Sequence, residues 1–156
     1  MKTLILYATK YGATGEIAER IADNMGGAAL HDLKQSNIPD LEEFDCVIIG
    51  SSLYAGSMRK ETKAFLAKNA DKLLTKKIGL FLSGIAQSDE NKYFEGNFPK
   101  NILQAAKATS FLGGIFDPSK AGRMEQLIIK AVTKQSDYIN TVDDEKIKQF
   151  AEWMKQ

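Results

Sequence analysis

Short, unbroken apolar runs are the feature of this sequence that most constrains its fold. They lie at 3–7, 46–50, 78–83 and 110–116, and each is rich in Ile, Leu, Val or Phe. A strand with one solvent-exposed face alternates apolar and polar residues, whereas an unbroken apolar run indicates a strand buried on both faces. Strands of that kind belong to parallel sheets covered by helices. A weaker run at 28–33 predicts a fifth strand.

Amphipathic patterns separate these runs. Apolar residues spaced three or four apart predict helices over 14–25, 61–74 and 143–154, and a weaker pattern predicts one over 97–108. The alternation of strand and helix predicts an α/β fold with an open, doubly wound sheet and helices on both faces. The segment 117–142 is much longer than an ordinary connection, so it is an insertion before the last helix.

Composition excludes several classes of protein. The 156 residues fit one domain, and the formal net charge of +1 is unlike the strongly basic balance of a nucleic-acid binder. The single Cys46 excludes an internal disulfide and a cysteine metal cluster. The sequence contains neither a membrane-length apolar stretch nor a signal-peptide pattern. These observations predict a cytoplasmic protein without a nucleic-acid partner.

The junction between the first strand and the first helix predicts an anion site. Gly12 permits close approach of the backbone, and Thr9 and Thr14 carry hydroxyl groups. The N–H groups of a first helical turn lack intrahelical partners, and the helix dipole favours negative charge there, so a phosphate suits this position. Ordinary N-capping of the helix by Thr14 is an equal alternative.

Three other phosphate-site or strand-end patterns fail to match. The chain contains no G-x-x-x-x-G-K-[ST] run of a P-loop and no G-x-G-x-x-G of a dinucleotide-binding fold. A receiver domain requires acidic residues at the ends of the first and third strands, where this chain has small and hydroxyl residues instead.

The remaining T-x-x-G-x-T pattern resembles the FMN-phosphate loop of flavodoxins, with Tyr11 in place of the middle Thr. This resemblance implies a flavodoxin-like five-stranded parallel sheet in the order 2-1-3-4-5. It also implies bound FMN, with the ring between the loops after the third and fourth strands and Tyr54 stacked on it. The implied FMN-binding residues are Thr9, Lys10, Tyr11, Gly12, Ala13, Thr14, Ser51, Ser52, Leu53, Tyr54, Ala55, Gly56, Ser83, Gly84, Ile85 and Ala86.

Three segments resemble a narrower group, the flavodoxin-like menaquinone-dependent protoporphyrinogen dehydrogenases. They are "MKTLILYATKYGATGEIA", "GSSLYAG" and "GGIFDPSKAGRMEQLIIKAV". The resemblance implies an FMN oxidoreductase that oxidises protoporphyrinogen IX with a quinone acceptor. The insertion of that group is richer in Arg and aromatic residues, so a non-catalytic FMN electron carrier remains the alternative. In both cases the flavin supplies the chemistry, and no catalytic side chain is implied.

Charge near the ring separates these two functions. Electron-carrier flavodoxins are very acidic, whereas the loop at 51–60 carries Arg59 and Lys60 and no acid. Positive charge stabilises a reduced, anionic flavin, so we expect both side chains to make the hydroquinone couple less negative. Such a couple favours a quinone partner.

The insertion contains a predicted amphipathic helix. Its apolar residues fall at helical spacing, and Lys130 and Lys134 face away from them. Either this helix contacts a redox partner or the inner face of a membrane through 120–135, or it caps the sheet beside the fifth strand. The apolar stripe consists of Met124, Leu127, Ile128, Ala131 and Val132.

Overall fold

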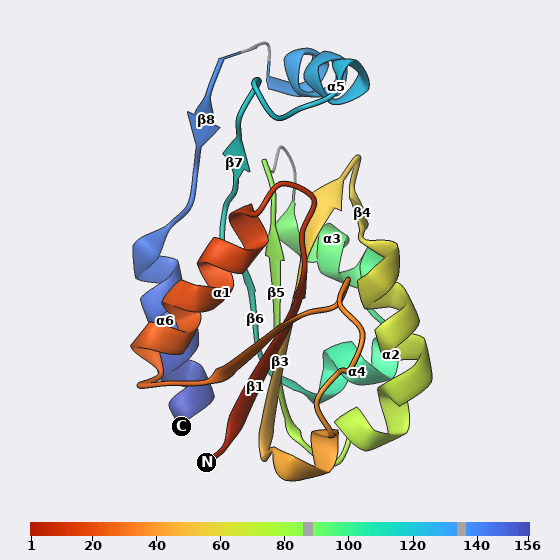
Figure 1. The fold of residues 1–156 in the computed structure, drawn as a ribbon, viewed down its shortest axis with the longest axis vertical. Helices are drawn as coiled ribbons and strands as arrows, with labels where there is room; N and C mark the ends of the chain where they lie inside the picture. Colours follow the sequence, from red (N-terminus) through yellow and green to blue (C-terminus); the bar gives the residue numbers. More distant parts are fainter. Residues whose placement is uncertain (86–88, 134–136) are drawn as a thin grey trace.

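A computed structural model describes residues 1–85, 89–133 and 137–156. At its centre is a parallel sheet in the order β2-β1-β3-β5-β6, with the short β4 paired antiparallel to β3. This arrangement confirms the predicted order, because the five parallel strands follow the sequence 2-1-3-4-5 (Figure 1). The strands are β1 (Thr3–Ala8), β2 (Ala29–Asp32), β3 (Cys46–Tyr54), β4 (Ser57–Met58), β5 (Lys77–Ser83) and β6 (Ala106–Phe111).

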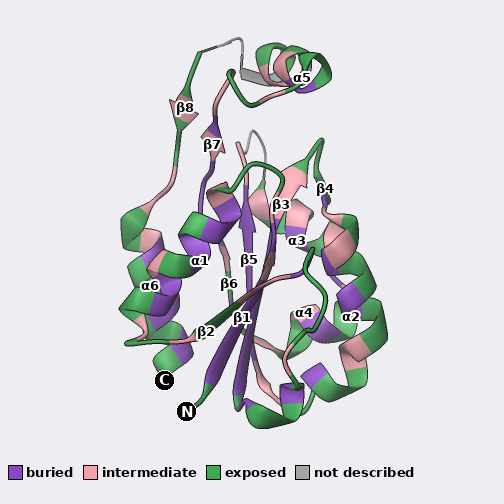
Figure 2. Ribbon diagram, viewed as in Figure 1, coloured by how far each residue is buried: buried purple, intermediate pink, exposed green. Residues whose placement is uncertain are grey.

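Helices cover both faces of the sheet, as the sequence predicts. Helices α1 (Ala13–Asn24) and α6 (Asp144–Lys155) pack on one face, where Ile17 and Phe150 meet Ile48 and Phe81. The opposite face packs against α2, α3 and α4, and a 3-10 turn at Leu41–Glu43 precedes β3. Figure 2 shows the inner strands almost entirely buried between these layers. The helices of that second layer are α2 (Lys60–Leu73), α3 (Glu90–Asn97) and α4 (Lys100–Ala105).

Two predicted elements were wrong in their limits. The predicted helix over 97–108 is shorter and contains only α4, because α3 ends at Asn97, before Pro99, and β6 begins at Ala106. The residue before a proline is disfavoured in the helical region, so Pro99 separates α3 from α4. The predicted strand over 110–116 is displaced. The fifth sheet strand is β6, which begins earlier and is a half-exposed edge strand, so it lacks an unbroken apolar run. It ends before Gly113, whose φ of 79° interrupts the strand.

The insertion rises beyond the carboxyl ends of the parallel strands. The short strand β7 (Ile115–Phe116), just before the insertion, pairs antiparallel with β8 (Ile139–Asn140) inside it, and between them the chain forms α5 (Arg123–Thr133). The predicted helix is therefore present, but it lies over the strand ends rather than beside the fifth strand (Figure 1). Within the described residues, no helix is both long and apolar enough to cross a membrane.

Candidate functional site

The loop after β1 leaves the N-terminus of α1 open. Gly12 is the N-cap with φ 98°, a left-handed conformation that glycine adopts without a steric penalty. Its N–H donates to Thr9 Oγ1 at 2.9 Å, and no side chain caps the first turn of α1. Capping by Thr14 is therefore wrong, since Thr14 lies inside the helix. The N–H groups of this first turn remain suited to an external anion.

Thr14 faces the core rather than the loop. Its Oγ1 lies 2.7 Å from Ser83 Oγ, and both residues are almost completely buried. This hydrogen bond joins the first turn of α1 to the last residue of β5. A hydroxyl placed in this way orients the loop but is not presented to a phosphate on the open side.

A tight hairpin between β3 and β4 carries Tyr54. Ala55 and Gly56 both have positive φ, 49° and 77°, the pattern of a two-residue type I′ turn. The Asn97 side chain at the end of α3 holds this hairpin, accepting from Met58 N at 2.8 Å and donating to Gly56 O at 2.9 Å. Tyr54 consequently stands at a fixed position with 37% of its surface exposed.

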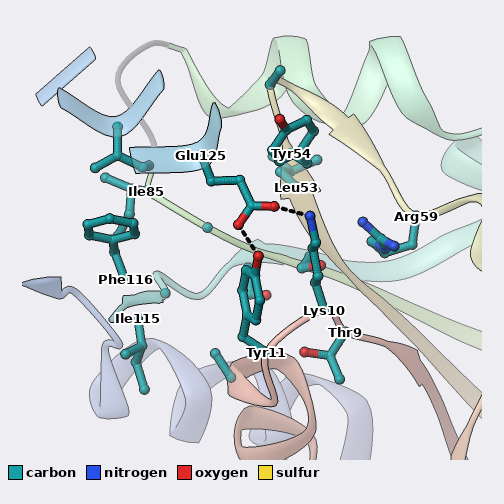
Figure 3. Close-up of a pocket in the computed structure, with 17 residues that line it drawn as sticks. Thr9, Lys10, Tyr11, Leu53, Tyr54, Arg59, Ile85, Ile115, Phe116 and Glu125 are labelled. Carbon is teal, nitrogen blue, oxygen red and sulfur yellow. Dashed lines mark hydrogen bonds and ion pairs between the residues drawn. The ribbon is translucent and has the colours of Figure 1, made fainter. Parts of the chain in front are cut away.

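These loops surround a cavity at the carboxyl edge of the sheet (Figure 3). Most predicted site residues line it, but Gly12, Thr14, Ser51 and Gly56 do not, and Ala86 lies outside the described residues. Ser51 is buried and accepts from Arg59 N, so it supports the wall from behind. The predicted residues that line the cavity are Thr9, Lys10, Tyr11, Ala13, Ser52, Leu53, Tyr54, Ala55, Ser83, Gly84 and Ile85.

The insertion supplies a roof that the sequence analysis did not predict. Glu125 and Ile129 of α5 line the same cavity as the loop at 9–14, together with residues of the segment that leads into the insertion. One face of α5 thus closes the cavity, while Met124 and Leu127 on the same helix are 68% and 63% exposed. Glu125 lies off the apolar stripe, so the sequence pattern gave no signal of this role. The other roof residues are Gly114, Ile115 and Phe116.

Charged groups connect the roof to the loop at 9–14. The Glu125 carboxylate, in a residue only 8% exposed, accepts hydrogen bonds from Lys10 Nζ and Tyr11 Oη (Figure 3). The Lys10 ammonium also lies 5.0 Å from the centroid of the Tyr54 ring, within cation–π range. Arg59 also lines the cavity, and its Nε lies 3.9 Å from a carboxylate oxygen of Glu61.

The donor set suits a phosphate ester that carries a flat heterocycle. The uncapped turn of α1 can bind the phosphate, and small residues leave room for a ring near Tyr54. The floor of the cavity requires the backbone after β5 and the backbone after β6 to approach each other closely. Gly84 N donates to Gly113 O at 3.0 Å, and a Cβ on Gly114 would lie 2.8 Å from the Gly84 backbone.

Comparisons with known proteins agree with this fold. Residues 4–142 match a family model described as a flavodoxin domain. The chain is 28% identical to a flavodoxin from Helicobacter pylori over 162 residues, covering 97% of this chain and 94% of that protein. It is also similar to flavodoxin 1 from Bacillus cereus, with a TM-score of 0.61, 17% identity, and coverage of 99% of this chain and 97% of that one.

A second relative matches over a shorter segment. Protoporphyrinogen IX dehydrogenase [quinone] from Escherichia coli K12 is 32% identical over 77 residues. The match covers 47% of this chain and 42% of the dehydrogenase. The chain therefore matches less than half the length of that relative.

Proposed function

This chain belongs to the flavodoxin-domain family, whose cofactor is FMN, and from that premise we propose that it is an FMN-dependent oxidoreductase for a small, flat, largely apolar substrate. When bound, FMN supplies the electron-transfer chemistry. The chain's own residues bind the cofactor, orient it, and shape the space where a substrate meets it.

We assign the phosphate to the loop at 9–14. The first-turn N–H groups of α1 and the Thr9 hydroxyl would hold it, and Gly12 would keep the backbone close. The ring would lie between the loops at 51–56 and 83–86, with Tyr54 against it. Ser51 and Thr14 support these loops from the buried side.

The observation that carries the enzyme proposal is the shared lining of the cavity. Ile115, Phe116 and Ile129, from or beside the insertion, form apolar walls on the same cavity as the phosphate loop. A carrier that passes electrons to large proteins requires no such roof, whereas a small apolar substrate requires desolvated walls. The partial match to a quinone-linked dehydrogenase supports protoporphyrinogen IX or a quinone as that substrate.

A second candidate function is a non-catalytic electron carrier. The match to the Helicobacter pylori flavodoxin supports it, because that similarity extends over 97% of this chain. The two functions differ in what reacts with the reduced protein. An enzyme exchanges electrons with a small molecule inside the roofed cavity, and a carrier does so at an exposed edge with a protein.

We further propose that α5 contacts the surface of an acidic membrane from the cytoplasmic side, where quinones dissolve. Its exposed Met124 and Leu127 share one short segment with the exposed cations Lys120, Arg123 and Lys130. Flotation with vesicles of acidic lipid tests this contact. Leu127→Glu should abolish flotation, and undiminished flotation of that variant would contradict the contact.

Rapid mixing tests the enzyme proposal. The FMN-loaded protein, reduced anaerobically, should be reoxidised by 2-methyl-1,4-naphthoquinone faster than free reduced FMN is. Ile129→Ala in the roof should slow the quinone reaction, whereas Leu127→Ala on the exposed face of the same helix should not. Equal rates for wild type, both variants and free FMN would favour the carrier function.

A further inference from the structure

The charges on the cavity wall are already paired within the chain. Among the described residues that line the cavity, the charged ones are Lys10, Arg59 and Glu125. Lys10 is bound to the Glu125 carboxylate, and Arg59 lies 3.9 Å from Glu61. Each positive charge on the described wall therefore has a carboxylate within 4.0 Å, which offsets its attraction for an anionic substrate.

Glu125 makes the cavity unfavourable for a second anion. Its carboxylate lines the cavity and is 8% exposed, so water screens it poorly. An anionic group beside it would meet a like charge in a low-dielectric space, or would have to displace the carboxylate from Lys10 and Tyr11. Both outcomes weaken binding of a carboxylated or sulfonated molecule.

A neutral carbonyl meets no such penalty. An ammonium group has three donors, and the Lys10 hydrogen bond in the described structure goes to Glu125. The Lys10 Nζ lies 5.4 Å from the centroid of the Tyr11 ring and 5.0 Å from that of the Tyr54 ring, so its other donors are available beside these rings. A carbonyl oxygen on a flat ring can accept from Lys10 while the ring contacts the apolar roof.

We propose that Glu125, held by Lys10 and Tyr11, is a specificity-determining residue that selects a neutral quinone and excludes anionic substrates, carboxylated tetrapyrroles included. The inference rests on the proposed FMN oxidoreductase function and narrows its substrate. In this proposal Lys10 donates a hydrogen bond to the substrate and holds α5 through Glu125. The FMN phosphate is then bound by the backbone N–H groups at the N-terminus of α1.

Calorimetric titration of the FMN-loaded, oxidised protein tests this assignment without turnover. The probes are 2-methyl-1,4-naphthoquinone and 1,4-naphthoquinone-2-sulfonate, which share a ring system and differ in charge. We expect wild-type protein to bind the neutral quinone at least about tenfold tighter, and Glu125→Gln to narrow that ratio about fivefold or more. Glu95→Gln, at an exposed acid outside the cavity, should leave the ratio unchanged.

A second variant should change the ratio of the two affinities in the opposite direction. Lys10→Gln removes the partner of Glu125, so the ratio should widen in favour of the neutral quinone. An unchanged ratio in Glu125→Gln, or a narrowed ratio in Lys10→Gln, would overturn the inference while leaving FMN binding intact. The absorption spectrum of each preparation is recorded first. A protein that takes up no FMN would overturn the proposed function, and this inference with it.

Discussion

Replacing Thr14 with Val should destabilise the protein by leaving the Ser83 hydroxyl buried without a partner. The two hydroxyl oxygens lie 2.7 Å apart, with Thr14 0% and Ser83 1% exposed. A buried polar group that loses its partner costs about 1–3 kcal/mol. With a urea m-value of about 1–3 kcal/mol/M, the unfolding midpoint of the FMN-free protein should fall by roughly 1 M.

A double-mutant cycle identifies the mechanism. Ser83→Ala should cost about as much as Thr14→Val, and the double variant should cost clearly less than the two together, with a coupling of about 1 kcal/mol or more. FMN and riboflavin should both bind more weakly to Thr14→Val, because the whole loop shifts. Unchanged stability, combined with a selective loss of FMN affinity, would refute this reasoning and indicate that the Thr14 hydroxyl contacts the phosphate.

Other residues give shorter tests. Tyr54→Ala should weaken FMN binding by about 1 kcal/mol or more and raise flavin fluorescence, and unchanged emission would limit Tyr54 to packing. Arg59→Gln should make the two-electron potential more negative by on the order of tens of millivolts, whereas the exposed Lys60, which does not line the cavity, should shift it less. A larger shift from Lys60→Gln would contradict this placement. Burial raises the pKa of the Cys46 thiol above its usual range, so the folded protein should resist thiol reagents at neutral pH. Immediate labelling would contradict that burial.

The buried strands and helices were predictable because the pattern of apolar residues within each segment indicates which of its faces are buried. The unbroken apolar runs of β1, β3 and β5 are buried on both faces, and α6 buries the predicted stripe that includes Ile147 and Phe150. The limits of the edge strand β6 were not predicted because its exposed Lys107 and Thr109 break the apolar pattern. Hydrogen bonding to the next strand, rather than hydrophobicity, places an edge strand of that kind.

The loops that line the cavity were predicted from the sequence, but the residues of its roof were not. The loop residues follow strand ends, and parallel strands bring their carboxyl ends to one edge. The position of Glu125 depends on how β7 and β8 carry α5 over that edge, and local sequence does not encode that distance. The orientation of the Thr14 hydroxyl was not predictable for a related reason. Whether its hydroxyl faces the loop or the core depends on Ser83, which lies 69 positions away along the chain.

The most direct test of the central claim is the ratio of FMN to riboflavin affinity, measured by flavin fluorescence titration. Two charge-assisted hydrogen bonds from the α1 N-terminus, at about 1.5–3 kcal/mol each, predict FMN binding roughly 100-fold tighter or more. Gly12→Ala should reduce that ratio sharply. Gly26→Ala is the matched control, because Gly26 also has a positive φ and open space for a Cβ. Both variants should therefore lose about 1 kcal/mol of stability, but Gly26→Ala should leave the affinity ratio unchanged. Equal affinities for FMN and riboflavin in the wild-type protein would contradict a phosphate site at this helix.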